Sequence, residues 1–242
     1  GLECFFRLNE KNNKQARYFF EEAINIDKGY AMAYIALGFT HMGDLVFGWS
    51  KSPIESFEHA EKNVEKALAL NDSTDLPHGL LGWIYLFKRQ HDEAIKAGER
   101  AIELNPNGAE AHANLALILL YSDKIELAIK LLKRAFRLNP IPPSYYYDLL
   151  GIAYRVNGQY EKAIEMGKKA VSISPDNVSA YITLAASYSP INRTEDASKA
   201  VEEILRIQPD FSLEYFVNTL PYKNQEELDK FINALRKAGL PE

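Results

Sequence analysis

The pattern of hydrophobic and polar positions repeats along this chain about every 34 residues. Each period holds an apolar run, a short polar turn, a second run with alanines at fixed places, and a proline. The prolines that set the register, Pro106, Pro140, Pro175 and Pro209, lie 34, 35 and 34 residues apart. Proline stops one helix and can begin the next. The pattern therefore predicts an all-α chain built from successive helix pairs.

Small residues recur where two helices of such a pair would approach closely. In the second helices these positions hold Ala94, Ala128, Ala163 and Ala197, followed by Ala101, Ala135 and Ala170. In the first helices a Leu-Gly or Leu-Ala pair recurs at 81–82, 115–116, 150–151 and 184–185. Small side chains allow close backbone contact, and large neighbours fill the remaining space. A single hairpin cannot bury its apolar faces alone, so the hairpins are expected to stack.

These residues resemble the tetratricopeptide repeat (TPR) family. The resemblance covers 75–209 and implies a right-handed superhelical solenoid of antiparallel helix pairs. It divides the chain into one solenoid whose four regular repeats span 75–108, 109–142, 144–177 and 178–211. We expect a truncated first repeat over 1–30, with its first helix beginning before Gly1, and a second repeat over 31–74 with about ten extra residues near 44–53.

The last residues, 212–242, are predicted to form a C-terminal cap. Asn224 is a suitable N-cap with Glu227 three residues later, and Gly239 is a suitable stop, so a helix is expected from about Gln225 to Ala238.

The apolar run "LLGWIYLF" at 80–87 has too many apolar residues for a helix with a single buried stripe. In a TPR stack the first helices line a concave groove, and the resemblance assigns fixed repeat positions to that groove. A contiguous apolar patch of this kind marks a binding surface. The candidate partner-binding residues are Met32, Ile35, Phe39, Met42, Leu76, Trp83, Leu86, Phe87, Leu117, Leu120, Tyr121, Tyr145, Asp148, Ile152 and Arg155.

The occupant of this groove is open at the level of sequence. The family's carboxylate clamp of groove Lys and Asn is absent here, which favours an apolar or amphipathic segment as partner. The partner is a protein or peptide, the chain itself, or a second copy. Alternatively, superhelical curvature closes the groove, or 44–53 folds back with Phe47 and Trp49 as a plug. Asp148 and Arg155 either orient a partner or form a solvated pair.

Composition narrows the function classes further. The net charge of −5 argues against nucleic acid as a partner, since phosphate binding needs a basic face. The longest apolar runs are too short for a membrane span. One cysteine, Cys4, excludes an internal disulfide framework. These features favour a soluble, cytoplasmic protein.

No constellation for catalysis, cofactor binding or metal binding is found in the sequence. His78 and His112 occupy equivalent repeat positions, but two histidines lack the third protein ligand of a catalytic zinc. No glycine-rich phosphate loop and no Gly-x-Ser-x-Gly elbow is present. The chain is therefore predicted not to be an enzyme and to carry no cofactor.

The tail "TLPYKNQEELDKFINALRKAGLPE" and the stretch "AINIDKGYAMAYIALGFTH" are similar to the TPR region that follows the catalytic domain in bacterial class III adenylate/guanylate cyclases. The resemblance implies a non-catalytic interaction scaffold, the regulatory region of a larger signalling protein. Two alternatives are a small-molecule or lipid sensor that uses the same groove and a free-standing TPR adaptor.

Overall fold

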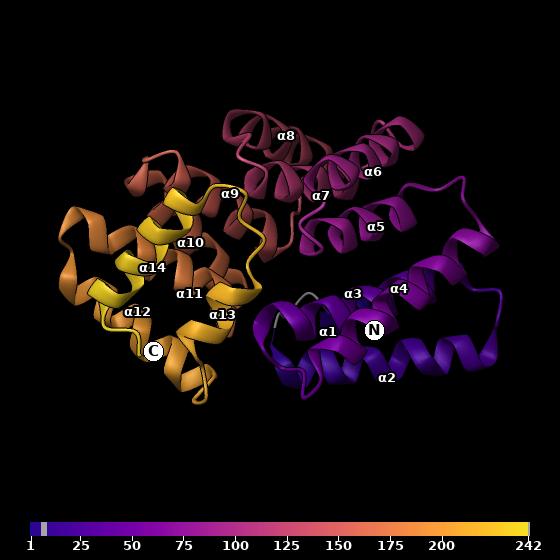
Figure 1. The fold of residues 1–242 in the computed structure, drawn as a ribbon, viewed down its shortest axis with the longest axis horizontal. Helices are drawn as coiled ribbons and strands as arrows, with labels where there is room; N and C mark the ends of the chain where they lie inside the picture. Colours follow the sequence, from indigo (N-terminus) through magenta and orange to yellow (C-terminus); the bar gives the residue numbers. More distant parts are fainter. Residues whose placement is uncertain (6–8, 242) are drawn as a thin grey trace.

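The computed structural model describes residues 1–5 and 9–241, and every regular element in these ranges is helical (Figure 1). Part of the predicted truncated repeat, residues 6–8, lies outside the described residues. The helices are α1 (Leu2–Phe5), α2 (Glu10–Ile26), α3 (Ala31–Phe47), α4 (Pro53–Leu70), α5 (Asp75–Phe87), α6 (His91–Leu104), α7 (Ala109–Tyr121), α8 (Ile125–Leu138), α9 (Ser144–Val156), α10 (Tyr160–Ile173), α11 (Val178–Tyr188), the 3-10 turn η1 (Ser189–Ile191), α12 (Thr194–Ile207), α13 (Leu213–Thr219) and α14 (Gln225–Ala238).

Five hairpins form the body of the molecule: α3–α4, α5–α6, α7–α8, α9–α10 and α11–α12. Each helix of these hairpins packs most closely on its own hairpin partner. In addition, each first helix from α3 to α9 packs on the first helix of the next hairpin, whereas the second helices pack mainly on the neighbouring first helix. The first helices therefore lie together on the inner side of the curve. This side is called the concave surface below.

Close packing at the small residues explains the repeating pattern. A Cβ atom added to Gly82 would lie 2.7 Å from Ile118 Cδ1 and 3.3 Å from the carbonyl oxygen of Ala94. The recurring alanines of the second helices are fully buried. These contacts join each hairpin internally and to the next one, so the apolar core continues from α5 through α12.

The extra residues near 44–53 are partly helical. Asp44–Phe47 extend α3 to 17 residues, and only 48–52 connect it to α4. Gly48 ends α3 in the left-handed conformation, with φ of 71°. Asp44 stays in the helix because its carboxylate accepts hydrogen bonds from Asn13 and Arg17 of α2. The longer helix brings Leu45 and Phe47 toward the C-terminal end of the chain.

The C-terminal residues divide into two parts. Helix α14 is preceded by the N-cap Asn224, whose side chain accepts hydrogen bonds from the Glu226 and Glu227 amides, and it is followed by Gly239. It packs on α11, η1 and α12. The short helix α13 instead packs against α3, which lies far earlier in the sequence. Figure 1 shows α13 between the last hairpins and the N-terminal hairpins.

Candidate functional site

The predicted groove residues are spread over the concave surface but differ in their exposure. Six are partly buried, and these are Phe39, Leu76, Trp83, Phe87, Tyr145 and Ile152. Met32 is exposed. The other eight are buried, namely Ile35, Met42, Leu86, Leu117, Leu120, Tyr121, Asp148 and Arg155.

Residues 208–223, called the covering segment below, lie on this concave surface. They comprise the connection after α12, the helix α13 and the extended chain that leads to α14. Five of their apolar side chains are less than 9% exposed and join the main core, and these are Phe211, Leu213, Phe216, Leu220 and Tyr222. The surface that the sequence assigns to a partner is therefore occupied in part by the chain itself.

The end of the covering segment binds to α7 and α9. The Lys223 amide donates to the Tyr121 carbonyl at 2.9 Å, and the rings of Tyr121 and Tyr222 meet edge to face at 4.9 Å. The Arg155 guanidinium donates to the Tyr222 hydroxyl at 2.8 Å and lies 4.3 Å from the centre of the Phe231 ring. Arg155 is thus enclosed by the covering segment and α14 rather than solvated.

The start of the covering segment binds to the end of α3. Gln208 accepts a hydrogen bond from the Trp49 indole at 3.3 Å and donates to the Phe47 carbonyl at 3.2 Å. The Tyr215 hydroxyl donates to the Leu45 carbonyl at 3.5 Å. Phe47 and Trp49 stack on each other at 4.8 Å, so they contact the covering segment as a pair.

A third contact joins the C-terminal part of the covering segment to the turn after α5. Arg89 donates to the carbonyls of Leu220 and Tyr222, each at 3.3 Å. Arg89 has a positive φ of 59°, a conformation that few non-glycine residues adopt outside turns. The α5–α6 turn therefore aims the guanidinium at two main-chain carbonyls.

Burial against α11 changes the ionisation of Asp148. This residue is 4% exposed and accepts a hydrogen bond from the Thr183 hydroxyl at 2.9 Å. Removal from water raises the pKa of Asp148 to about 6, against the opposing effects of hydrogen bonds and of Arg155. The Arg155 Nε atom is buried without a hydrogen-bond partner. Covering these polar groups therefore has an energetic cost.

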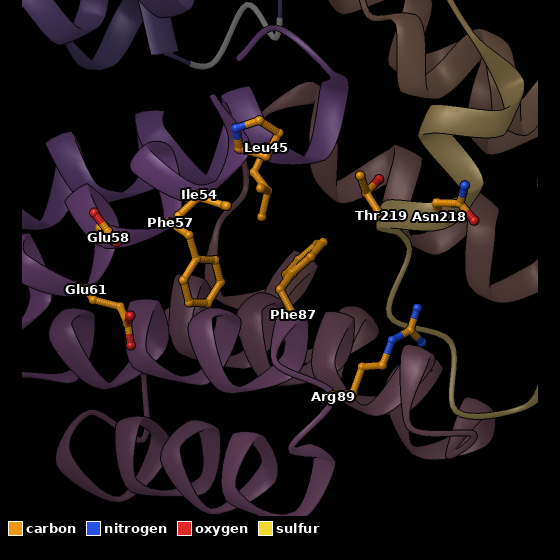
Figure 2. A pocket seen from close by; sticks show the side chains of 10 residues that line it. Leu45, Ile54, Phe57, Glu58, Glu61, Phe87, Arg89, Asn218 and Thr219 are labelled. Carbon is orange, nitrogen blue, oxygen red and sulfur yellow. The ribbon is translucent and has the colours of Figure 1, made fainter. Parts of the chain in front are cut away.

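An open pocket of about 480 Å³ remains beside the covering segment. Figure 2 shows Phe87 between Phe57 and Ile54 of α4 on one side and Thr219 of α13 on the other. The remaining lining residues are Leu45, Pro53, Glu58, Glu61, Arg89 and Asn218. Lys88 pairs with Glu61 and lies over the Phe57 ring. The pocket is thus apolar at its centre, with charged residues at its rim.

Sequence reasoning found the concave surface but missed what covers it. The sequence assigns residues 212–223 to a cap and Phe211 to the last repeat, and it gives Phe57 and Arg89 no groove position. The spacing of Leu213, Phe216 and Leu220 by three and four residues is a helical apolar stripe. That stripe was visible in the sequence, but its destination depends on the curvature of the whole stack.

The histidines take structural positions. His41 stacks on His59 at 4.9 Å, a pair that the sequence did not suggest. Burial and the nearby Arg17 charge lower the pKa of His41 to about 3. The two histidines at equivalent repeat positions, His78 and His112, each contact a main-chain carbonyl. His78 contacts the Asp72 carbonyl and His112 the Gly108 carbonyl. Within 1–5 and 9–241 no three His, Cys, Asp or Glu side chains gather as a metal site.

Family models of the tetratricopeptide repeat match residues 76–107, 97–130, 114–178 and 157–215, which together span more than half of the chain. The chain belongs to the tetratricopeptide repeat family. This confirms the all-α solenoid predicted from the proline and alanine spacing. Over the part of the chain that the structure describes, no helix has both the length and the apolar character needed to cross a membrane.

Several solved TPR structures are similar in fold to this TPR chain. A chain of the APC/C hetero-tetramer Cut9-Hcn1 matches with a TM-score of 0.65 and 19% identity, covering 87% of this chain and 40% of that one. PilW, a type IV pilus biogenesis factor, matches with a TM-score of 0.62 and 16% identity, covering 86% and 89%. The thermophilic TPR protein TTC0263 of Thermus thermophilus matches with a TM-score of 0.58 and 20% identity, covering 81% and 99%.

Among curated proteins, the peroxisomal targeting signal receptor of Candida albicans is 36% identical over 62 residues. The match covers 26% of this TPR chain and a tenth of that receptor's length. The chain likewise spans less than half of the matched chain in the Cut9-Hcn1 assembly.

Proposed function

We propose that this chain is a non-catalytic protein-binding scaffold whose concave surface takes an apolar or amphipathic segment of a partner. The main support for this proposal is that the covering segment already occupies the concave surface. It seats an amphipathic helix on the concave surface, with Phe216 and Leu220 buried and main-chain carbonyls held by Arg89. A surface that binds such a segment from its own chain has the chemistry to bind one from another protein.

The proposed partner-binding residues are the fifteen named from the sequence, together with the pocket. Those that remain partly accessible are the best contacts for an incoming side chain, and Phe87 is foremost because it lines the open pocket. Two similar proteins agree with this role, since one is a receptor for a targeting signal and another is part of a hetero-tetramer. No nucleic acid is proposed as a partner, and the proposed location is the cytoplasm.

Selection from a display library of short random peptides on the full chain tests the proposal. We expect the selected peptides to be apolar or amphipathic, and Phe87→Ser to weaken their binding by at least ~10-fold. Ile173→Ser is the matched control, since Ile173 is half exposed on α10, outside the concave surface. Selected peptides that bind both variants and the wild type equally would refute the concave surface as the binding site.

We also propose that the chain is the regulatory region of a larger signalling protein such as a bacterial adenylate/guanylate cyclase. This rests on the resemblance of residues 219–242 and 23–41 to the TPR regions of those enzymes. Sequencing the gene upstream of the Gly1 codon tests it. An open frame encoding a cyclase domain is the expected result. A start codon within one helix length of Gly1 would leave a free-standing TPR adaptor instead.

A small-molecule or lipid sensor is the second candidate, and the pocket is the observation that favours it. Its volume of about 480 Å³ falls within the ~300–1,000 Å³ typical of small-molecule sites, and its centre is apolar. A sensor would gain thermal stability with the logarithm of the concentration of an added fatty acid or similar amphiphile. The same melting temperature at all concentrations would exclude this class of ligand.

A further inference from the structure

The covering segment is held in the way that a bound peptide is held. Its side chains pack on apolar residues, while its main chain is bonded by groups of the concave surface. Arg89 donates hydrogen bonds to two carbonyls of the segment, and the Tyr121 carbonyl accepts a hydrogen bond from the Lys223 amide. Main-chain hydrogen bonds are independent of side-chain identity, so any segment with the same apolar spacing meets the same donors and acceptors.

The helical part of the covering segment depends on that surface for its own structure. Helix α13 has seven residues, and an isolated helix of that length is not stable in water. It starts at Ser212, whose hydroxyl accepts from the Tyr215 amide, and it ends before Pro221. Release from the concave surface would therefore unfold α13, and docking would refold it.

The fit of the covering segment is incomplete on its polar side. The Arg155 Nε atom is buried beneath it with no partner, and the contacts to Trp49, Phe47, Leu45 and Arg89 are 3.2 to 3.5 Å long. A buried donor without an acceptor disfavours the state that buries it. A competing segment that supplies an acceptor to Arg155 would bind more favourably at this point.

An incoming segment also has a place to bind before the covering segment leaves. The open pocket lies directly beside Asn218 and Thr219, at the end of α13, and its apolar centre includes Leu45 and Phe87 (Figure 2). An apolar side chain placed there would lie next to the end of α13. The pocket and the covered surface together form one binding surface that extends from α4 to α11.

We propose that the covering segment competes with a partner for the concave surface. We also propose that the partner which displaces it resembles the segment in structure and apolar spacing. The partner is a short amphipathic helix followed by an extended chain. Its apolar residues match the spacing of Leu213, Phe216, Leu220 and Tyr222, which is three, four and two residues. This inference rests on the proposed function, because it specifies the segment that the concave surface recognises and the contact that limits access to it.

A labelled synthetic peptide of residues 208–223, added to the full chain, tests the proposal by fluorescence anisotropy. The wild-type chain should bind it weakly, because its own segment is in place. The double variant Phe216→Ala and Leu220→Ala weakens the segment within the chain and leaves the receiving surface intact. It should bind the wild-type peptide at least tenfold more tightly. Leu127→Ala with Ile173→Ala, both on partly exposed residues of other helices, is the matched control and should bind as the wild type does.

The outcomes separate this inference from the proposed function. If the double variant keeps the helical content of the wild type and binds the peptide no more tightly, the covering segment is a permanent part of the core and the inference is wrong.

A second measurement on the wild-type chain avoids any dependence on folding of the variant. The 208–223 peptide should displace a display-selected peptide that is sensitive to Phe87→Ser, whereas a peptide carrying Phe216→Ser and Leu220→Ser should not. Selected peptides that bind at Phe87 without such competition would overturn this inference but keep the proposed function. Failure to select any peptide sensitive to Phe87→Ser would overturn both.

Discussion

The two halves of the concave surface are built from the same repeat but differ in what lies on them. Around α3, α4 and α5 the surface keeps an open pocket, with Phe87 partly exposed. Around α7, α9 and α11 it is covered by α13 and the chain after it, and Tyr121 and Arg155 are buried. Exposure thus differs at some equivalent positions of the two halves, although Met42 and Leu86 are buried in the first half and Ile152 is partly exposed in the second.

This difference shows that repeat position alone does not determine exposure. Phe87 and Tyr121 lie 34 residues apart at equivalent repeat positions, yet Tyr121 is 8% exposed and contacts Tyr222, whereas Phe87 borders the pocket. What covers a concave residue is set by the path of the chain after the last hairpin. The contrast can be tested by substitutions on each side of the boundary.

The largest effect is expected from removing a side chain of the covered half. Phe216→Ala should lower the free energy of unfolding by ~3 kcal/mol or more, because Phe216 is 7% exposed within the main core. Ile54→Ala at the open pocket should change it by less than ~0.5 kcal/mol, since Ile54 is 74% exposed. Urea denaturation measures both. Equal losses for the two variants would mean that the halves do not differ.

The two halves should respond to pH with opposite changes in stability, because one buries a histidine and the other a carboxyl group. In the N-terminal half, the pKa of His41 in the folded state is lowered to about 3. Its contribution to the free energy of unfolding is therefore complete above pH 6.5 and is lost as the pH falls. In the covered half, burial raises the pKa of Asp148 to about 6, so stability falls as the pH rises from about 4 to 6 and is then constant. The change is roughly 5 kcal/mol or less for His41 and roughly 3 kcal/mol or less for Asp148.

The variants His41→Gln and Asp148→Asn check these signs by urea denaturation between pH 3.5 and 7.5. The first should reduce the loss of stability in acid, and the second should remove a decline between about pH 4 and 6. A pH profile unchanged by Asp148→Asn would contradict the burial of an ionisable carboxyl between α9 and α11.

A smaller effect is expected at the boundary between the halves. Arg89→Asn should lower stability by ~1 kcal/mol, because it removes two hydrogen bonds to the covering segment. Asparagine tolerates the positive φ of this position, so the turn itself is kept. The neighbouring Lys88→Ala removes a pair with Glu61 and leaves the covering segment untouched. Thermal melts that show the same shift for both variants would exclude a specific role for Arg89.

The smallest change in stability is expected at the rim of the pocket. Ile54→Asp should leave the melting temperature unchanged within error, because the residue is exposed. It should nevertheless weaken the binding of a concave-surface peptide by several-fold, since it places a charge on an apolar wall of the pocket. Isothermal titration with a selected peptide measures this. Unchanged affinity would place the open binding region elsewhere.

Local patterns predicted the fold well because the repeat is local. The cap residues Asn224 and Gly239 act on their own helix, and the Leu-Gly pairs contact the same or the next repeat. The covered half could not be predicted in the same way. The contacts of Gln208 with Trp49 and of Tyr215 with Leu45 join residues far apart in sequence, and they depend on the summed curvature of five hairpins.

The pocket shows the same limit on a smaller scale. The repeat position predicts that Phe87 faces the groove, but its neighbours in the pocket come from α4 and from α13. The extension of α3 through Phe47 brings α3 within reach of α13, whereas the sequence predicted only about ten extra residues near 44–53.

Hydrogen exchange of the full wild-type chain is the sharpest test of whether α13 is a displaceable occupant of the concave surface. We expect the amides of 213–223 to exchange markedly faster than those of α9 and α11, because the covering segment opens while the hairpins stay folded. A bound concave-surface peptide should speed this exchange further. Protection of 213–223 equal to that of α11, unchanged by the peptide, would show that α13 is a fixed part of the fold.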